Sequence, residues 1–358
     1  MEPLKNIYNT LFLKKLAQAI KTEYIDFHEH EFIELVVQDD WEELALKERM
    51  RRITISLHKK IPLEYKEVLF CFYKVAPKFT GLAGIIFPDY VEVYGRECWE
   101  ESMAALEYFT KYSTSEFAVR PYLVLDQMKM MNQMQTWAKS ENEHVRRLAS
   151  EGCRPRLPWG MMVPALKKDP TPVLPILELL KEDESLYVRK SVANNINDIS
   201  KTHPDLVMEM AERWYGENNQ TNWIVKHACR TLLKKGNIRA LRLFGYEESG
   251  EVVISDFVCK EQVLAIGENL SFSFQVTSAS TKKVRIEYSI DYVKARGTRS
   301  RKMFHLSETI LQQGEKRRYE KTHAFKDLTT RKHYAGMHTL AIFVNGEKKA
   351  EVDFDLRK

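Results

Sequence analysis

One stretch of the chain combines charged and aromatic residues that a packing connector does not need. A helical pattern reaches Glu151 and Gly152 and then breaks into Arg154-Pro-Arg156 and, two residues later, Pro-Trp159. Because proline fixes φ and lacks an amide hydrogen, this segment is predicted to be short, stiff and non-helical. Arginines bind anions, carboxylates bind cations, and tryptophan packs its ring face against cationic groups. The segment is therefore a candidate binding or catalytic site.

A second candidate set lies on the predicted helix from about Ser185 to Lys201. Val188, Val192, Ile196 and Ile199 step by three or four and define its buried face. Asn194 and Asp198 lie four residues apart on a different, polar face, with Ser191 beside them. The alternative is an ordinary solvated face, the usual position for one acid among 50.

Two glutamates have a structural explanation as well as a chemical one. Glu116 follows Ser113-Thr-Ser115, residues that cap helices, and a carboxylate suits the first turn of the helix that should follow. Glu151 can pair with Arg147 four residues earlier, which contributes a few tenths of a kcal/mol. Neither glutamate would be singled out by its local sequence alone.

Basic residues cluster in two places. Lys226, Arg230 and Lys234 step by four and predict a cationic ridge about 12 Å long, comparable to two phosphate spacings. The alternative is again a solvated helix face. The segment 294–302 places five bases in nine residues at a predicted strand-to-strand turn. A turn needs its glycine but not the bases, and their mutual repulsion favours an anionic partner such as nucleic acid.

Other potential sites do not hold together. His28 and His30 are two apart, so on a helix they point to different faces and do not form a metal site. The five cysteines are scattered and form no Cys-x-x-Cys pair. This argues against a zinc site or a disulfide framework and predicts a reducing compartment, the cytoplasm.

Length and composition predict more than one domain. A chain of 358 residues with 44% hydrophobic and 29% charged residues is typical of a globular protein with two cores. Its apolar runs are too short to span a bilayer, and the amphipathic N-terminus is not a signal peptide. Apolar spacing predicts helices over residues 3–20, 28–38, 40–60, 63–77 and 98–112, with a loop over 80–89.

A short motif then repeats along the helical region. An apolar residue followed by a base recurs near a helix start, at spacings of 26, 43 and 37 residues. Paired helices of about 40 residues are typical of a HEAT-like solenoid. The four occurrences are Val119-Arg120, Val145-Arg146, Val188-Arg189 and Val225-Lys226.

The pattern changes to short alternating strands after about Gly250. Seven or eight strands in about 105 residues predict an immunoglobulin-like β-sandwich. The linker Tyr246-Glu-Glu-Ser-Gly250 divides a helical domain, residues 1–248, from a β domain, residues 251–358. The β domain holds 20 Lys and Arg against 14 Asp and Glu, whereas residues 1–250 hold 35 against 36. A polyanion is therefore expected to meet the β domain.

These motifs together resemble the AlkC-type DNA alkylation-repair glycosylases, which are related to the AlkD group. The resemblance spans nearly the whole chain, and its middle motif is long and unusual. The segments that carry it are Ser115-Glu-Phe-Ala-Val-Arg-Pro121, Ser150-Glu-Gly-Cys-Arg-Pro-Arg-Leu-Pro-Trp159, Val188-Arg-Lys-Ser-Val-Ala-Asn-Asn-Ile-Asn-Asp198 and the turn Arg299-Ser-Arg-Lys302.

The resemblance implies an activity and a partner. Members excise small cationic methylated bases, chiefly 3-methyladenine and also 3-methylcytosine, from double-stranded alkylated DNA without full base flipping. The chain would act as a monofunctional glycosylase and a monomer, with no metal, no organic cofactor, no membrane and no obligate protein partner.

It also implies site residues. The active-site acids and aromatic correspond to Glu116, Glu151, Asp198 and Trp159. Asp198 and Glu116 would flank the sugar and a water, Glu151 would add negative potential or hold the site, and Trp159 would pack against the lesion or the cationic sugar. The DNA-binding residues would be Arg120, Arg154, Arg156, Arg189, Lys226, Arg230, Arg296, Arg299, Arg301 and Lys302.

Two other functions fit the same architecture. A helical-repeat scaffold could bind a protein on its concave face, but it has no reason to bring the four predicted catalytic residues together. A non-catalytic binder of damaged DNA would have the same fold and would release no free base.

Overall fold

The computed structural model describes residues 3–328 and 331–358 of the chain. The chain divides into two compact units, each considered by itself. The first comprises Met1–His203 and Gly216–Ala228, and the second comprises Pro204–Tyr215 and Cys229–Lys358.

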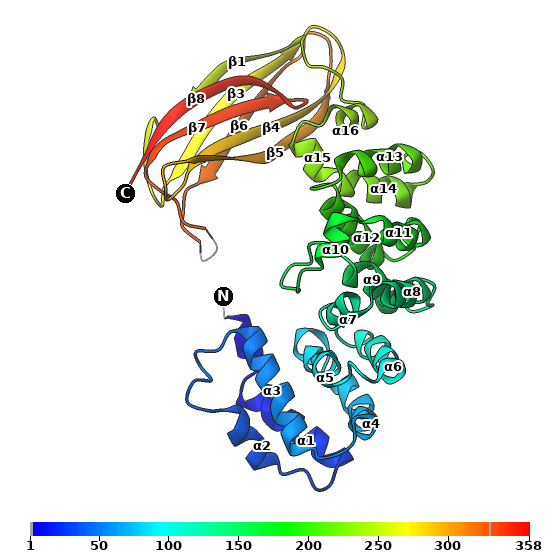
Figure 1. Cartoon of the computed structure of the whole chain (residues 1–358). Coiled ribbons are helices and arrows are strands. Elements are labelled where there is room, and N and C mark those ends of the chain that lie inside the picture. Colours follow the sequence, from blue (N-terminus) through cyan, green and yellow to red (C-terminus); the bar gives the residue numbers. More distant parts are fainter. Residues whose placement is uncertain (1–2, 329–330) are drawn as a thin grey trace. The chain divides into compact units, whose positions relative to one another are not determined.

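The first unit is helical, and its helices follow one another in pairs along the chain (Figure 1). Short 3-10 helices cover Leu4–Ile7, Ala76–Lys78, Gly81–Ile85 and Thr171–Val173. The α-helices are α1 (Thr10–Glu23), α2 (Glu29–Val36), α3 (Leu46–Lys60), α4 (Tyr65–Val75), α5 (Ile86–Tyr94), α6 (Trp99–Thr110), α7 (Arg120–Leu125), α8 (Gln127–Trp137), α9 (Glu143–Gly152), α10 (Pro164–Lys168), α11 (Leu174–Leu180), α12 (Leu186–Ile199) and α14 (Asn219–Ala228).

Most predicted helices are present with shorter bounds, and one predicted loop is wrong. The N-terminal helix starts late because the Asn9 side chain caps α1, accepting from the Phe12 amide at 2.9 Å. Residues 80–89 were expected to form a loop because of their glycines and Pro88. Instead they form a 3-10 turn and the start of α5. Pro88 lies in the first turn of α5, where a missing amide hydrogen breaks no helical hydrogen bond.

In two of the four repeats, the arginine of the Val-Arg motif closes the turn before its own helix. Arg146 of α9 donates to the carbonyl oxygens of Ser140 and Glu141 at 3.0 and 2.8 Å. Arg189 of α12 donates in the same way to Asp183 and Glu184, at 2.7 and 2.8 Å. Each of the two arginines thus donates to the carbonyl groups six and five positions earlier in the chain. The valine before each arginine is fully buried.

Helices α9 and α12 pack side by side, and α12 also packs on α14. Gly152, which ends α9, faces α7 and α8 so closely that a Cβ atom would lie 2.7 Å from Val119 Cγ2 and 2.8 Å from Met134 Cε. A larger residue there would displace a neighbour. The close approach fixes the end of α9, where Glu151 lies.

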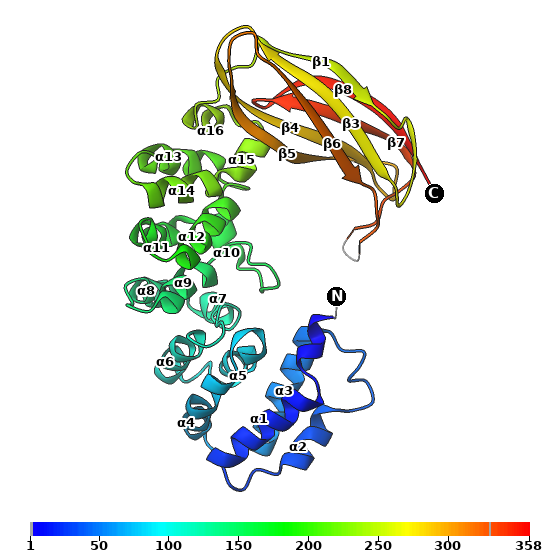
Figure 2. The ribbon, with the colours of Figure 1, turned by 180° about the vertical axis from the view of Figure 1, so that it is seen from behind.

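The second unit contains a two-sheet β-sandwich and short helices. One sheet has the order β1-β3-β6, and the other has the order β2-β8-β7-β4-β5. Figure 2 shows the two sheets face to face. Its elements are α13 (Pro204–Trp214), α15 (Arg230–Lys234), α16 (Ile238–Leu243), β1 (Val252–Cys259), β2 (Val263–Ala265), β3 (Asn269–Ser278), β4 (Lys282–Val293), β5 (Arg299–Leu311), β6 (Lys316–Ala324), β7 (Gly336–Val344) and β8 (Glu347–Arg357).

The sandwich core consists of aliphatic and aromatic side chains from both sheets. Three histidines of the described part of this domain are also buried: His323, His333 and His338. His323 of β6 lies 3.0 Å from the Tyr288 hydroxyl and 2.8 Å from the Tyr292 hydroxyl, both of β4. Burial lowers the pKa of His323 to about 4, so the ring is neutral at physiological pH. The prediction of helices followed by a β-sandwich is confirmed.

Candidate active site

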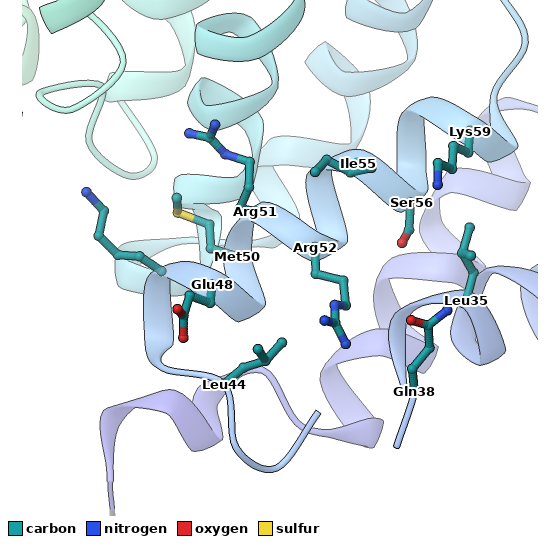
Figure 3. A pocket seen from close by; sticks show the side chains of 11 residues that line it. Leu35, Gln38, Leu44, Glu48, Met50, Arg51, Arg52, Ile55, Ser56 and Lys59 are labelled. Atoms are coloured by element: carbon teal, nitrogen blue, oxygen red, sulfur yellow. The ribbon is translucent and has the colours of Figure 1, made fainter. Parts of the chain in front are cut away.

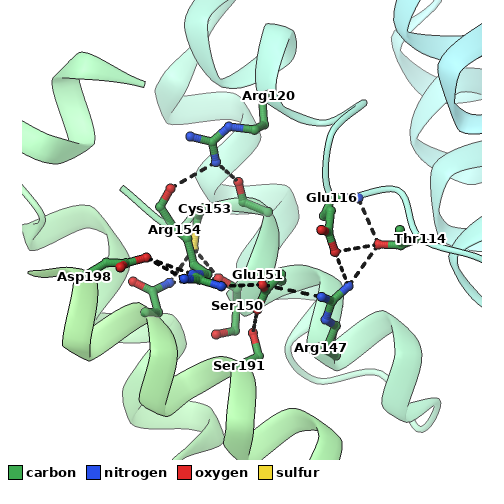
Figure 4. Close-up of polar contacts among 12 residues, drawn as sticks. Thr114, Glu116, Arg120, Arg147, Ser150, Glu151, Cys153, Arg154, Ser191 and Asp198 are labelled. Atoms are coloured by element: carbon green, nitrogen blue, oxygen red, sulfur yellow. Dashed lines mark hydrogen bonds and ion pairs between the residues drawn. The ribbon is translucent and has the colours of Figure 1, made fainter. Parts of the chain in front are cut away.

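Three elements of the first unit hold the predicted catalytic acids. Glu116 lies in the turn between α6 and α7, Glu151 in the last turn of α9, and Asp198 in the last turn of α12. Glu116 was expected in the first turn of a helix, but α7 begins only at Arg120. The three carboxylates nevertheless come together, linked through arginine side chains (Figure 4).

Arg147 and Arg154 join the acids into one chain of ion pairs. Arg147 contacts Glu116 and lies 3.5 Å from the Glu151 carboxylate. Arg154 Nη1 donates to Glu151 Oε1 at 2.6 Å. The other edge of Arg154 holds Asp198 Oδ2, with Nη2 at 2.8 Å and Nε at 2.9 Å. Neighbouring acids are therefore no more than one guanidinium group apart.

Lys201 adds one more ion pair to this series, at Asp198. Its ammonium group lies 2.8 Å from Asp198 Oδ1, so both oxygens of this carboxylate have a cationic partner. The Lys201 side chain is 37% exposed, whereas that of Arg154 is 9% exposed. Lys201 can leave Asp198 for solvent or a ligand much more readily than Arg154 can. The i,i+3 spacing of Lys201 from Asp198 is the one sequence feature that indicates this contact.

Hydroxyl groups fix the carboxylates further. Ser191 donates to Glu151 Oε2 at 2.6 Å, and Thr114 donates to Glu116 Oε2 at 2.8 Å. Ser191 was predicted to lie beside Asp198, and its partner is Glu151 instead. With Ser191 on one oxygen and two arginines at the other, Glu151 has more side-chain partners than either of the other two acids.

The charges in this series of ion pairs nearly cancel. Three carboxylates meet Arg147, Arg154 and Lys201. Burial lowers the pKa of Arg147, but Glu151 and Glu116 outweigh it and raise that pKa above its usual value. Burial likewise opposes the effect of Glu151 and Asp198 on Arg154, whose pKa is also raised. Both arginines stay charged, and the acids act as fixed acceptors rather than as a net negative charge.

Trp159 lies on the loop after α9, and its side chain points into solvent. Trp159 is 63% exposed, and its indole ring makes no hydrogen bond or ring contact with the described residues. Its backbone has φ of 61°, a left-handed conformation that is uncommon for a large side chain. Lys47 of α3 donates to the Trp159 carbonyl oxygen at 2.8 Å. Sequence patterns gave no signal for Lys47, which is 112 residues away.

Three arginines that were predicted to hold phosphates have protein partners in this structure, and their contact with DNA stays a prediction. Arg120 is fully buried and donates to the carbonyl oxygens of Met161, Gly152 and Arg154. Burial lowers the pKa of Arg120 to about 10. Arg154 is occupied by the acids, and Arg189 closes its own turn. Arg120 and Arg154 are buried, whereas Arg189 is half-buried and donates to its turn through Nη1.

Arg156 differs from these three arginines. It lies in the same loop as Trp159, is half-buried, and makes no ion pair with the described residues. Its Nε atom is buried without a hydrogen-bond partner among them. Among the described residues, Arg120 Nη2 and Arg189 Nε are buried without a partner as well. Such groups are rare in folded proteins, and an anion or water is one of the partners that can satisfy them. Arg156 therefore remains a candidate for an anion.

The predicted ridge of Lys226, Arg230 and Lys234 is not one helix face. α14 ends at Ala228 and α15 begins at Arg230, with Cys229 between them at ψ of 2°. The helical spacing that would align the three bases is interrupted, so we correct the ridge to two separate short segments.

The basic turn of the β domain is present and borders a pocket. Residues 294–298 connect β4 to β5, with Gly297 at φ of 76°. Arg296 is exposed, Arg299 donates to Thr339 Oγ1 at 3.0 Å, and Arg301 pairs with Asp291 at 2.7 Å. A pocket of about 510 Å³ is lined by Tyr292, Val293, Lys294, Ser300, Arg301, Lys302, Leu328, Arg331 and Lys332.

A second pocket, of about 550 Å³, lies along α3, where Leu44, Arg51, Arg52 and Ile55 are among its lining residues (Figure 3). None of the predicted catalytic residues lines it. Within residues 3–328 and 331–358, no three or more His, Cys, Asp or Glu side chains are grouped to hold a metal ion. Over the same residues, every helix is too short or too polar to cross a membrane.

The fold and site define a class: helical proteins with a buried chain of acids and arginines, followed by an immunoglobulin-like β domain. The family model of a DNA alkylation repair enzyme matches residues 50–232. The model of the C-terminal Ig-like domain of uncharacterised protein YhaZ matches residues 253–358. The chain therefore belongs to the DNA alkylation repair enzyme family.

Two relatives resemble the chain over its whole length. The uncharacterized protein YhaZ of Bacillus subtilis (strain 168) is 56% identical over 356 residues, which cover 99% of this chain and 100% of YhaZ. A solved structure of the Pseudomonas fluorescens alkylpurine DNA glycosylase AlkC, bound to DNA containing an abasic site analog, superposes with a TM-score of 0.96. It is 41% identical, and the match covers 100% of both chains.

Proposed function

We propose that this protein is a DNA glycosylase that hydrolyses the N-glycosidic bond of cationic alkylated bases, 3-methyladenine and 3-methylcytosine, in duplex DNA without full base flipping. The observation that carries the proposal is the linkage of Glu116, Glu151 and Asp198 by Arg147 and Arg154. A protein-binding scaffold has no use for three acids at one buried point, and the 41% identity to an alkylpurine DNA glycosylase adds support.

The chemistry asks for carboxylates and little else. An N3-methylated base is positively charged and already a good leaving group, so its departure needs no strong general acid. The sugar develops oxocarbenium charge, which an oriented carboxylate stabilises, and a water must be aligned for attack. Fixed acceptors suit this task because they need no reorganisation as charge develops.

We propose different roles for the three acids, on the basis of their contacts. Glu151 is held by Arg147, Arg154 and Ser191, so we propose that it maintains the site rather than meeting the sugar. Asp198 keeps one oxygen on Arg154, while its Oδ1 contacts the exposed Lys201. We propose that Lys201 moves to a DNA phosphate when substrate binds, which frees Oδ1 for the water or the cationic sugar. Glu116 flanks the same region from the α6–α7 turn.

The solvent-facing loop after α9 would meet the damaged nucleotide. Trp159 presents its indole to solvent, and a ring face attracts a cation by up to about 2 kcal/mol when desolvated. Arg156 of the same loop would bind a phosphate through its unpartnered guanidinium. Phosphate contacts fix the register of the DNA and carry no sequence information.

We further propose that the basic pocket of the β domain contacts the DNA backbone. Lys294, Arg301 and Lys302 line it from the β4–β5 hairpin, and Arg331 and Lys332 line it from the segment before β7. Like charges held this close repel one another, and burial together with Arg331 lowers the pKa of Lys302. A phosphate group would relieve that repulsion.

A base-release assay tests the proposed activity. Duplex DNA methylated at N3 of adenine is incubated with the protein, and free base is separated and quantified. We expect release of 3-methyladenine, and a fall of at least about a hundredfold for Asp198→Asn, within the range for a positioned catalytic group. No free base from the wild-type protein, together with binding to the same DNA, would identify a non-catalytic binder.

A further inference from the structure

The loop that carries Trp159 holds an unfavourable backbone conformation at an exposed position. Trp159 has φ of 61°, and with 63% of its surface exposed it gains little from packing. Such conformations persist where the surroundings impose them, and they are concentrated at functional sites. Two long-range contacts tether this loop: buried Arg120 donates to the Met161 carbonyl, and Lys47 donates to the Trp159 carbonyl at 2.8 Å.

Lys47 also reaches the segment that holds the first acid. Its ammonium nitrogen lies 4.2 Å from the centre of the Phe117 ring, the residue directly after Glu116. One cation from α3 therefore touches both the backbone of Trp159 and the residue beside Glu116. Lys47 is half-buried, and burial lowers its pKa against the opposing effect of Glu92 and Asp89. A lysine that only improved solubility would not be desolvated at such a point.

We propose that Lys47 is a positioning residue for the glycosylase reaction: its ammonium group fixes the Trp159 backbone relative to the Glu116 turn, and so sets where the indole meets the substrate. This inference rests on the proposed function. Lys47 takes no part in the bond-breaking step itself. Its effect comes through Trp159, whose carbonyl group is tied to the acid-bearing turn by a contact spanning 112 residues.

The test uses Lys47→Met in the full chain, because methionine keeps an apolar stem on Phe117 but cannot donate to the Trp159 carbonyl. The matched control is Lys59→Met, the same change at an exposed lysine of the same helix that also lines the α3 pocket. We expect Lys47→Met to lower the single-turnover rate of 3-methyladenine release at least about tenfold, a loss within the range that misplacement of a distant group can cause. The affinity for duplex DNA should change less than about threefold, and Lys47→Arg should recover most of the rate because it can still donate.

A second measurement follows the indole without catalysis. The Trp159 contribution to fluorescence anisotropy is obtained by subtracting the signal of a Trp159→Phe chain, in the wild-type and Lys47→Met backgrounds. We expect the Trp159 anisotropy to fall in Lys47→Met and to stay unchanged in Lys59→Met. An unchanged anisotropy, or a rate no lower than that of Lys59→Met, would overturn the proposal. If the wild-type chain released no base, the proposed function would fail, while the anisotropy would still decide whether Lys47 holds Trp159.

Discussion

Replacing Arg154 by methionine should destabilise the helical unit strongly. Arg154 bridges Glu151 and Asp198, whose side chains are 7% and 2% exposed. Methionine fills a similar volume but leaves both carboxylates without their shared guanidinium. Removing one partner of a buried ion pair costs about 3 to 5 kcal/mol, because the remaining charge stays desolvated. Lys201 offsets part of this cost at Asp198 only, so we expect a loss near the middle of that range.

Urea unfolding followed by far-ultraviolet circular dichroism measures this loss, because the signal comes mostly from helices. Arg52→Met is the matched control: Arg52 also holds a carboxylate with two nitrogens, but its partner Asp40 is 51% exposed. A surface pair of this kind contributes about 1 kcal/mol or less. If Arg154→Met cost no more than Arg52→Met, the acids would be effectively solvated, and our view of a mutually compensated buried chain would be refuted.

Three further predictions concern other parts of the molecule. Neutralising Arg299, Arg301 and Lys302 should weaken binding to duplex DNA and reduce the slope of log affinity against log salt by about 1 to 2. The reduction is smaller than that for three full phosphate contacts because Arg301 is shared with an acid. An unchanged slope would show that the hairpin does not contact the DNA. Acidification should destabilise the β domain. His323 has a folded pKa of about 4 and an ordinary value of 6.5, so its contribution is present above pH 6.5 and is lost as pH falls towards 4. Burial also lowers the pKa of His338 to about 4, so melting at pH 5 should show a loss of which His323 accounts for about 1 to 2 kcal/mol. His323→Gln should reduce the loss by that amount, whereas equal losses in both proteins would contradict this origin. Trp159→Gly should leave the stability unchanged or raise it by up to about 1 kcal/mol, because glycine accepts a positive φ. Base release by this variant should fall at least about tenfold. A clear loss of stability would show that the indole packs against the protein.

The sequence predicted the elements well because their signals are local. Apolar spacing located α9 and α12, and alternating residues located the strands of the sandwich. Pro88 was misread because proline is a helix breaker only beyond the first turn. The HEAT-like description of the helices stays a prediction, although Arg146 and Arg189 close their turns identically.

The site was predicted less completely, because charge alone does not reveal whether a residue is buried. Arg120 and Arg154 looked like phosphate ligands since most arginines are exposed, and only the fold shows that they satisfy carbonyl and carboxylate groups. The catalytic roles of the three acids were predicted from a family resemblance. Their local sequences also allowed structural roles, such as helix caps and ion pairs within a helix. The role of Lys47 could not be predicted from the sequence, because its hydrogen bond to Trp159 forms only when α3 packs near the loop in the folded protein.

The alternation of charge along Glu116, Arg147, Glu151, Arg154 and Asp198 has an evolutionary consequence. Each interior member compensates two neighbours, so a substitution at one position changes what is tolerated at the next, and effects of single changes will not add. A lineage cannot exchange these residues one at a time without passing through an intermediate with a stranded charge. The five positions are expected to be kept or lost as a unit, whereas the exposed bases of the β4–β5 hairpin are free to drift independently.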